Sequence, residues 1–415
     1  MADWLREDQQ KELVPQLSDR FVQALYPAYE ELPYELKVLC LNMSMLPPGY
    51  VFDKDALMKK WVCEGLVYEI FPIAPSENTE GCFSRLIDQN IITRSCCRLK
   101  LDDVDVSQWK LNPVMMQFFI SKSAEKGFVY TSDTLNSDME KASTSDCGNS
   151  TIKPRRVALH HPTPLLPSAL EKVDFSQTCS LSVSGAVDIF SLKVFVNLSS
   201  LDVEGWDNFN DDYLLEIRKI EMIFLKCLTI KRTQVSRLPP EIKNLVNLLM
   251  LDISFTQITE LPLEVLELDH LIDLDVRGTR ISYFPNIPNE DWRTWHRLRV
   301  LRASRATRMP LNAYYFHRLS IVETIDLREY PASVFEVLSN LQELKMISMI
   351  LSSHQCTRGA FSDALISCIQ GLEILLKSTL CLILNTFRKV VLQFFMRYLD
   401  YIYSLMNLTN SPFAV

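Results

Sequence analysis

The sequence of 415 residues lacks the short motifs of the common catalytic and nucleotide-binding sites. It contains no G-x-x-x-x-G-K-[ST] phosphate loop, no G-x-S-x-G nucleophile elbow, no H-E-x-x-H zinc motif and no C-x-x-C redox pair. His160 and His161 are adjacent and precede Pro162, so they cannot share a helix face as two metal ligands would, and we interpret them as exposed loop residues. We therefore expect no enzymatic activity, no metal ion and no bound cofactor.

The chain also lacks an excess of positive charge and the cysteine pattern of a secreted scaffold. Its formal net charge is −8 and its pI is about 5.4, which argues against a nucleic-acid partner, because phosphates favour a basic surface. The eleven cysteines form an odd set without paired spacing, which indicates reduced thiols. The first residues do not resemble a secretory signal. Together these absences predict a cytoplasmic protein.

Long uninterrupted apolar runs are missing as well. The region 351–415 is rich in leucine, valine and phenylalanine, but Lys377, Arg388, Lys389 and Arg397 interrupt it. A membrane-spanning helix needs about 18 or more consecutive apolar residues. We therefore predict an apolar helical tail that covers the end of the preceding domain and no membrane span. Membrane attachment and a divergent or mistranslated terminus are the alternatives.

The second half of the chain repeats itself at a constant interval. Leu228, Leu251 and Leu274 are equally spaced along the sequence. The same step relates several companion positions: Ile230, Ile253 and Val276; Thr233, Thr256 and Thr279; Leu238, Leu261 and Phe284; Pro239, Pro262 and Pro285. This pattern is a leucine-rich repeat, in which each unit contributes one short strand to a curved solenoid of α/β class.

Weaker copies extend the repeat in both directions. Strand-like segments occur at 157–159, 181–183, 198–203, 298–303, 322–327 and 341–346, which gives about seven or eight units. The step from Leu201 to Leu228 is longer than the regular one, which indicates an insertion on one face. The recurring threonine is expected to bond backbone groups where each strand turns away, and the recurring proline belongs on the convex return path.

Alternation along each strand predicts the binding surface. Leucine and isoleucine point inward, so the residues between them point outward onto the concave face. We define the concave-face set as these outward residues of the three clearest repeats: Cys227, Thr229, Lys231, Met250, Asp252, Ser254, Asp273, Asp275 and Arg277. We predict that they contact a protein partner. The alternative is that Asp252 and Asp275 only keep this face soluble.

The region 1–130 forms a different, mostly helical unit. Helices are expected over 33–45, after Asp53 as an N-cap and ending at Gly65, and around Phe83. The segments 91–93 and 98–101 are expected to form a hairpin. A last helix begins with Asn112 as cap and Pro113 as first residue, and its inward side chains are predicted to be Val114, Met115, Phe118 and Phe119. This order is typical of a winged helix.

These patterns divide the chain into four parts. We predict a winged-helix domain at 1–130, a polar linker at 131–152, a leucine-rich-repeat domain at 153–350 and the apolar helical tail at 351–415. The linker assignment depends on its content of Ser, Thr, Asp and Asn, which cannot bury a core.

Several segments resemble one protein family. They are Leu32-Pro33-Tyr34-Glu35-Leu36-Lys37, Leu41 with Ser44-Met45-Leu46-Pro47, Trp61-Val62-Cys63-Glu64-Gly65, Ser121-Lys122-Ser123-Ala124-Glu125, Phe128-Val129 and Arg155-Arg156-Val157-Ala158-Leu159. They are similar to the winged helix, and to the connection into the repeats, of plant nucleotide-binding leucine-rich-repeat resistance proteins of the coiled-coil class. The resemblance implies a defence response, with a pathogen-derived protein, a guarded host protein or a full-length receptor as partner.

The chain departs from this family at the nucleotide site. The family is implied to bind ADP or ATP through a phosphate loop that precedes the winged helix, and no such loop occurs here. The family's His-Asp pair, which is implied to touch the nucleotide, falls at Asn112 and Pro113, where we expect only a helix cap. The sequence thus indicates a truncated relative that recognises proteins without its own nucleotide switch. A degenerate receptor fragment and a winged-helix DNA-binding protein are the alternatives.

Overall fold

A computed structural model gives the fold of most of the two expected domains. The described residues are 19–67, 77–95, 99–101, 104–106, 108–137, 152–160, 173–188, 190–219, 222–285, 295–304, 307, 319, 321–326 and 346–350. The expected helical tail at 351–415 and the residue His161 lie outside this set.

A parallel sheet of ten strands forms the larger part of the described structure. The strands follow one another in chain order, from β6 (Tyr130–Thr131), β7 (Arg156–Leu159), β8 (Ser180–Val183), β9 (Ser200–Asp202) and β10 (Cys227–Thr229) to β11 (Met250–Asp252), β12 (Asp273–Asp275), β13 (Val300–Arg302), β14 (Ile321–Asp326) and β15 (Met346–Ile350). Leu228 lies opposite Leu201 on one side and Leu251 on the other, so the sequence repeat is also the strand register. The predicted solenoid is confirmed, with more strands than the expected seven or eight units.

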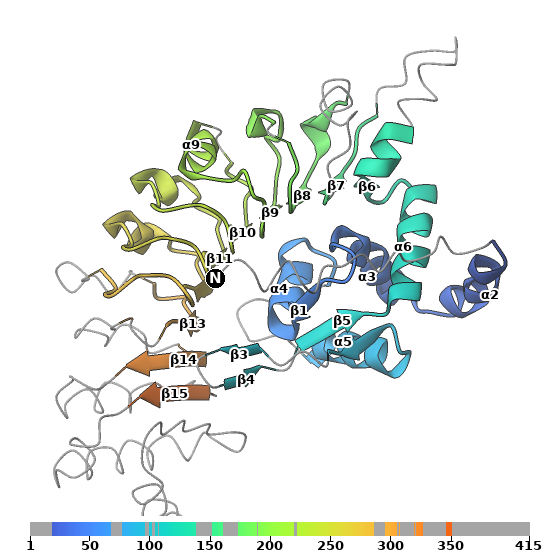
Figure 1. Cartoon of the computed structure of the whole chain (residues 1–415), viewed down its shortest axis with the longest axis horizontal. Coiled ribbons are helices and arrows are strands. Elements are labelled where there is room, and N and C mark those ends of the chain that lie inside the picture. Colours follow the sequence, from blue (N-terminus) through green and yellow to red (C-terminus); the bar gives the residue numbers. More distant parts are fainter. Residues whose placement is uncertain are drawn as a thin grey trace, which may run out of the picture.

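Helical turns cover the outer side of this sheet (Figure 1). They are η2 (Phe175–Gln177), η3 (Leu192–Val194), α9 (Asp211–Lys219), η4 (Pro240–Asn244) and η5 (Leu263–Glu267). The helix α9 occupies the longer interval before β10, which confirms the predicted insertion. Between the sheet and these turns lies one apolar core, in which Leu228, Leu251 and Leu274 are fully buried.

The recurring threonines close each strand as predicted. The hydroxyl Oγ1 of Thr233 donates to the carbonyl oxygen of Ile230 at 2.6 Å. Thr256 and Thr279 repeat this bond to the residue three positions earlier, each at 2.7 Å. Each bond satisfies a carbonyl that leaves the sheet ladder at that point.

The N-terminal unit, which we define as the described residues from 19 to 129, contains helices around a small antiparallel sheet. Its elements are α2 (Asp19–Glu30), α3 (Tyr34–Asn42), η1 (Met43–Met45), β1 (Val51–Asp53), α4 (Lys54–Cys63), α5 (Glu77–Asp88), β2 (Ile92–Arg94), β3 (Leu99–Leu101), β4 (Val104–Val106), β5 (Gln108–Leu111) and α6 (Pro113–Glu125). The sheet order is β1-β5-β2. Trp61, Phe83 and Phe118 are fully buried in its core.

The predicted helix ends of this unit agree with the structure. The Asp53 side chain accepts a hydrogen bond from the Ala56 amide at 3.0 Å at the start of α4, and Gly65 has φ +70° just after its end. The Asn112 side chain accepts from the Val114 amide at 3.0 Å, and Pro113 is the first residue of α6. The capping roles of Asp53 and Asn112 are thereby confirmed.

Two details of the N-terminal unit were predicted wrongly. The strand β2 pairs with β5, and β3 pairs with β4, so the segments 91–93 and 98–101 do not form a hairpin with each other. Val114 is 42% exposed, because it lies in the first turn of α6, and Met116 is buried in its place.

The boundary between the two units lies earlier than the composition indicated. The strand β6 already pairs with β7 at Tyr130 and Thr131, upstream of the predicted start of the repeats at 153. Residues 132–137 are helical, at the start of the expected polar linker, and residues 138–151 lie outside the described set.

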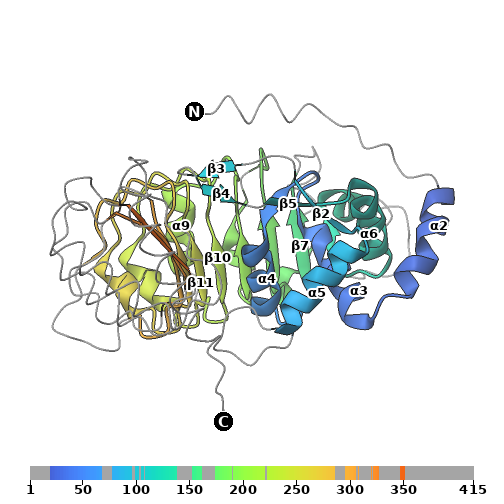
Figure 2. The same cartoon turned by 90° about the horizontal axis from the view of Figure 1, so that it is seen from below.

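The part of the N-terminal unit that contains α4 and β1 lies inside the curve of the repeats, and α2 lies farther from the strands (Figure 1). The strands line the inner side of the arc, and α4 faces them, as the view from below also shows (Figure 2). None of the described helices has the length and apolar character needed to cross a bilayer.

Gly278 offers a test of the close approach between neighbouring repeats. It has φ +68°, and a Cβ at this position would lie 2.4 Å from Cδ1 of Phe255 in the preceding repeat. Gly205 has the similar φ of +67° with nothing within 4 Å of its Cβ position. We expect Gly205→Ala to lower the unfolding free energy by about 1 kcal/mol through backbone strain alone. Gly278→Ala should cost about 2 to 4 kcal/mol because the ring must also move. Equal losses in urea titrations would contradict this packing.

Candidate functional site

Most of the concave-face set is buried, and the chain's own N-terminal unit contacts Cys227, Met250 and Asp273. Cys227, Asp273 and Asp275 are at most 4% exposed, and Thr229, Met250, Asp252 and Ser254 are also buried. Lys231 and Arg277 are half-buried. Alternation predicted the side of the sheet that these residues face, but it could not predict their burial, because it carries no information about what covers them. Their role in binding a separate protein stays a prediction.

Two lysines of α4 bind two aspartates of the repeats. The ammonium group of Lys60 lies 2.9 Å from Oδ2 of Asp202 on β9, and Lys59 forms an ion pair with Asp273 on β12. All four side chains are mostly withdrawn from solvent. Asp273 also accepts a hydrogen bond from Nη1 of Arg302 at 3.0 Å. The helix thus supplies cations to carboxylates that lie in the covered part of the sheet.

The C-terminal end of α4 contacts the first strands of the sheet with the opposite charge. Oε1 of Glu64 accepts a hydrogen bond from the Ser180 hydroxyl at 2.9 Å. Oε2 of Glu64 accepts from Nδ2 of Asn42 at 2.9 Å and lies 3.5 Å from Nε of Arg156. Charged side chains of α4 and of the residue that follows it therefore lie opposite side chains of the other sign on the sheet.

Further contacts extend the interface beyond α4. The Tyr50 hydroxyl donates to Glu204, whose carboxylate also binds Lys231 at 3.0 Å and Arg232 at 2.7 Å. Asp55, in the first turn of α4, lies 3.8 Å from Arg302 on β13. The N-terminal unit therefore contacts the sheet from its first repeats to β13.

Burial and ion pairing set the charge states of the interface. Burial opposes the charge of Asp202, but the ammonium group of Lys60 outweighs this effect and holds the pKa of the carboxyl below its usual value. The pKa of Asp273 is lowered in the same way, because Lys59 and Arg302 offset its burial. For Lys60, burial disfavours the cation, yet the carboxylates of Asp202 and Glu64 raise its pKa. These groups remain charged and paired near neutral pH.

Asp252 is an exception because it has no cation from the N-terminal unit. Its carboxylate accepts bonds from the Ser254 amide at 2.9 Å and from the Ser254 hydroxyl at 2.6 Å. Burial, followed by the neighbouring charge of Asp275, raises its pKa to about 7. Asp275 is paired with Arg277 of its own repeat, whose Nη2 lies 2.5 Å from Oδ2.

His160 has a different position from the one predicted. Its Nδ1 lies 2.8 Å from the Ser184 hydroxyl, and its Nε2 lies 2.8 Å from the carbonyl oxygen of Met45 in the N-terminal unit. It is therefore a half-buried bridge between the two units rather than an exposed loop histidine.

Sequence reasoning missed several residues of this interface. Asp202 and Arg302 occupy the same register position as Asp252, and Glu204 occupies that of Ser254, so extending the repeat register would have found them. Lys59 and Lys60 carried no such signal, because a pair of lysines on a short helix is usually solvated.

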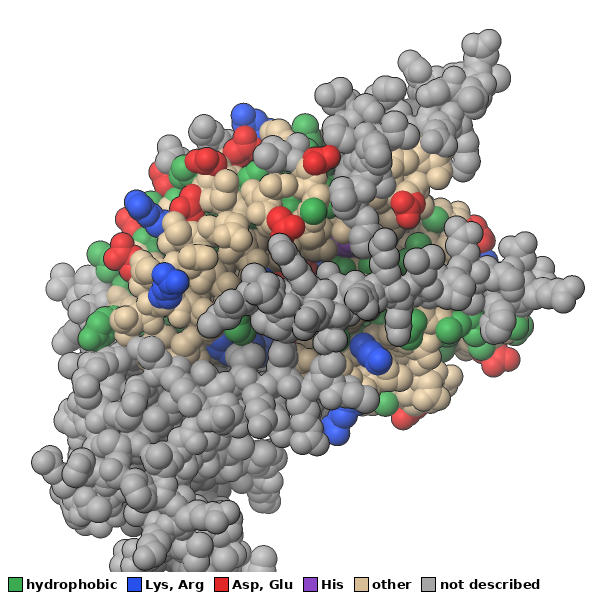
Figure 3. Space-filling view, in the orientation of Figure 1, with side chains coloured by type: hydrophobic (Ala, Val, Ile, Leu, Met, Phe, Trp, Pro, Cys, Tyr) green, Lys and Arg blue, Asp and Glu red, His purple; other side chains and the backbone are tan. Residues whose placement is uncertain are grey.

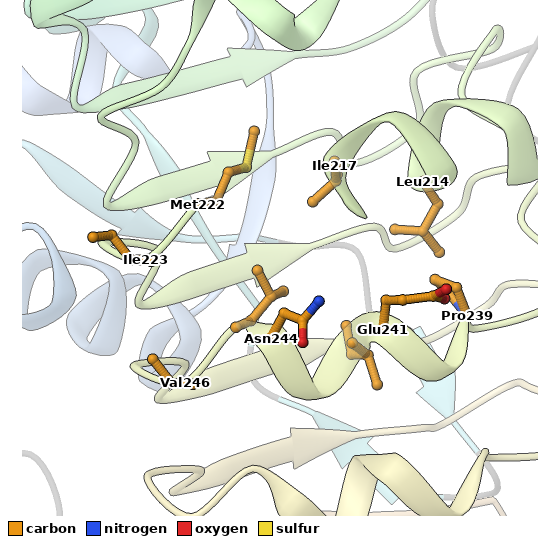
Figure 4. A pocket seen from close by; sticks show the side chains of 10 residues that line it. Leu214, Ile217, Met222, Ile223, Pro239, Glu241, Asn244 and Val246 are labelled. Carbon is orange, nitrogen blue, oxygen red and sulfur yellow. The ribbon is translucent and has the colours of Figure 1, made fainter. Parts of the chain in front are cut away.

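A second concave feature lies on the outer side of the repeats (Figure 4). It is a pocket of about 360 Å³ between α9 and η4, lined by Leu214, Ile217, Met222, Ile223, Pro239, Glu241, Ile242, Asn244, Leu245 and Val246. Ile223 and Val246 are 47% and 52% exposed at equivalent positions of neighbouring repeats. On the face in Figure 3, acidic and basic side chains alternate with hydrophobic ones along the outer curve of the repeats.

A match to a family model supports the assignment of the repeats, and one solved structure also matches part of the chain. A family model described as "Leucine-rich repeat region" matches residues 177–289. A leucine-rich-repeat protein of Leptospira interrogans matches 65% of this chain and 70% of its own, with 14% identity and a TM-score of 0.40.

The relatives by sequence are plant disease resistance proteins. Disease resistance protein Pikm1-TS of Oryza sativa subsp. japonica is 30% identical over 232 residues, which is 55% of this chain and 19% of that protein. Disease resistance protein PIK6-NP of the same organism is 26% identical over 219 residues, which is 52% of this chain and 20% of that protein. The chain is thus homologous to plant disease resistance proteins over about half its own length, and it spans about a fifth of theirs. The family resemblance inferred from the sequence is confirmed.

The raised pKa of Asp252 predicts a stability that depends on pH. The unfolded carboxyl ionises near pH 4 and the folded one near pH 7, so the folded state binds the extra proton between these values. Stability should therefore fall as the pH rises from about 4 to about 7. Asp252→Asn removes this penalty, keeps the acceptor for Ser254, and should raise the unfolding free energy at pH 8 by about 2 to 4 kcal/mol, with a clearly smaller gain at pH 5.

The matched control is Asp269→Asn, because Asp269 is an exposed aspartate of the same repeat region. It removes the same charge without relieving a buried one. Thermal or urea unfolding at both pH values gives the comparison. An equal effect of the two substitutions at pH 8 would show that Asp252 is not a buried, destabilised carboxylate.

Proposed function

We propose that this chain acts in plant defence as a protein-recognition or adaptor module, and that its concave face exchanges its own helix α4 for a partner protein. The observation that supports the proposal most is that α4 already engages part of the set expected to bind a partner. Lys59 forms an ion pair with Asp273, and Cys63 packs against Cys227 and Met250, which are contacts of the kind that join separate proteins.

The electrostatics of the face limit which partners can replace α4. Removing one member of a buried ion pair costs about 3 to 5 kcal/mol, because the other charge stays buried without compensation. A partner that supplied its own cations to Asp202 and Asp273 would avoid this cost. We therefore infer that the partner presents basic side chains to β9 and β12.

The proposed role does not include an autonomous nucleotide switch. No phosphate-loop motif occurs in the sequence, and Asn112 at the family's histidine position caps α6 through its bond to the Val114 amide. Control of access to the concave face would then come from the closure of the N-terminal unit itself. A full-length receptor, a guarded host protein and a pathogen-derived protein are all partners of the class that we propose, and a cytoplasmic location stays an expectation.

Charge reversal of α4 tests the proposal. Lys59→Glu with Lys60→Glu places carboxylates against Asp273 and Asp202, so the N-terminal unit should leave the concave face. We expect the charge-reversed full chain to label a defined set of proteins in plant tissue at least about tenfold more strongly than the unaltered chain does in proximity labelling. The reason is that α4 no longer occupies the concave face.

Two further variants make this experiment selective. Lys54→Glu with Lys126→Glu changes the net charge equally but alters residues outside the interface, since Lys54 pairs with Glu80 and Lys126 is exposed. Adding Asp202→Lys and Asp273→Lys to the first variant restores opposite charges and should restore closure. The proposal fails if all variants label the same proteins to the same extent while circular dichroism shows the repeats intact.

A further inference from the structure

The interface between the N-terminal unit and the repeats contains a small cluster of sulfur side chains. Cys63 at the end of α4, Cys227 at the start of β10 and Met250 on β11 pack together, with Leu249 beside them. The side chains of Cys63 and Cys227 are in contact within this cluster. Cys63 is 4% exposed and Cys227 is fully buried. Two cysteines that are distant in the sequence therefore meet across the boundary between the two units.

The surrounding contacts hold this pair in place. Lys60, one turn before Cys63, is bound to Asp202, and Glu64, the next residue, is bound to Ser180. The Cys227 amide donates to the carbonyl oxygen of Ser199 at 3.1 Å, which fixes the other side. In the docked arrangement these contacts hold the same two thiols together.

We infer that Cys63 and Cys227 are a modification site, at which oxidation by a peroxide forms a disulfide that locks the N-terminal unit onto the concave face. The bond would join α4 covalently to the central strand of the interface. It rests on the opening and closure of the N-terminal unit in the proposed function, but it does not depend on which partner, if any, the face binds.

The closed arrangement protects the thiols, and opening exposes them. The contact with Cys63, followed by burial, raises the pKa of Cys227 well above its usual value, so the reactive thiolate is disfavoured while the units are docked. When the N-terminal unit leaves the face, both thiols lose this contact and reach solvent. A peroxide then reaches a solvent-exposed thiol. Oxidation therefore begins in the open form, and the bond is completed on closure.

The chemistry balances with peroxide as the oxidant. One thiolate attacks a peroxide oxygen, the O–O bond breaks, and a sulfenic acid and one water are produced. On closure, the sulfur of the second thiol attacks the sulfenic sulfur, the S–S bond forms and a second water leaves. The two thiols together lose two electrons and two protons, and the peroxide is reduced to two waters. A dithiol reductant reverses the modification by exchange.

The test uses the full chain, purified reduced and then treated with hydrogen peroxide. Peptide mapping by mass spectrometry without reduction should recover the Cys63–Cys227 linkage as the main disulfide among all eleven cysteines. Amide exchange of α4 should slow at least about tenfold in the oxidised chain and return to its original rate after reduction. A map in which Cys63 or Cys227 links equally to several other cysteines, or to none, would overturn the inference.

Matched variants distinguish the proposed disulfide from simple packing of the two cysteine side chains. Cys63→Ala and Cys227→Ala should each abolish both the linkage and the slowing of exchange, and the remaining thiol should be trapped as a sulfenic acid by a dimedone probe. Cys40→Ala and Cys82→Ala remove buried cysteines of the N-terminal unit away from the interface and should leave both effects unchanged. The map of the unaltered chain needs no substitution, so the inference remains testable if a variant fails to fold.

Discussion

A carboxyl group on the concave side of the repeat sheet needs either a cation or a proton once it is buried. Asp202 and Asp273 lie on that side, and the two adjacent lysines of α4 provide the cations. Burial alone would favour the neutral acids, but the pKa values of both aspartates are lowered, because the ion pairs outweigh the loss of hydration. These two ion pairs hold α4 against the inner side of the sheet.

The repeat supplies the frame on which this interface is built. Each unit buries its leucines behind the sheet and presents its intervening residues to the inner side of the arc, so that charges from distant parts of the sequence align across strands. The helix α4 crosses these strands with a matching order of charges, from Asp55 opposite Arg302 to Glu64 opposite Arg156. A surface suited to holding another protein thus holds part of its own chain.

Much of the fold could be predicted from the sequence, because its determinants are local or periodic. The constant interval of the repeat predicted the strands and their register, and the threonine bonds followed from the turn chemistry. The caps at Asp53 and Asn112 were equally local. The pairing of β2 with β5 could not be predicted in this way. Several short strands compete for the same partner, and only tertiary packing decides between them.

The candidate site was predictable only in part. Alternation identified Asp252 and Asp273 as concave-face residues, but it carried no information about the segment that covers them. Lys60 and His160 gained their roles through contacts with residues far away in the sequence, and neither contact leaves a periodic signal. Only the folded chain therefore reveals the interface.

The distance distribution between the two units tests most directly whether the N-terminal unit occupies the concave face. Spin labels introduced as unnatural amino acids at exposed Glu35 on α3 and exposed Lys226 beside β10 can be measured by pulsed electron resonance in the full chain. We predict one narrow distribution centred on the separation in the structure. A broad distribution, or a dominant longer distance, would contradict this docking, because the N-terminal unit would then spend much of its time away from the repeats.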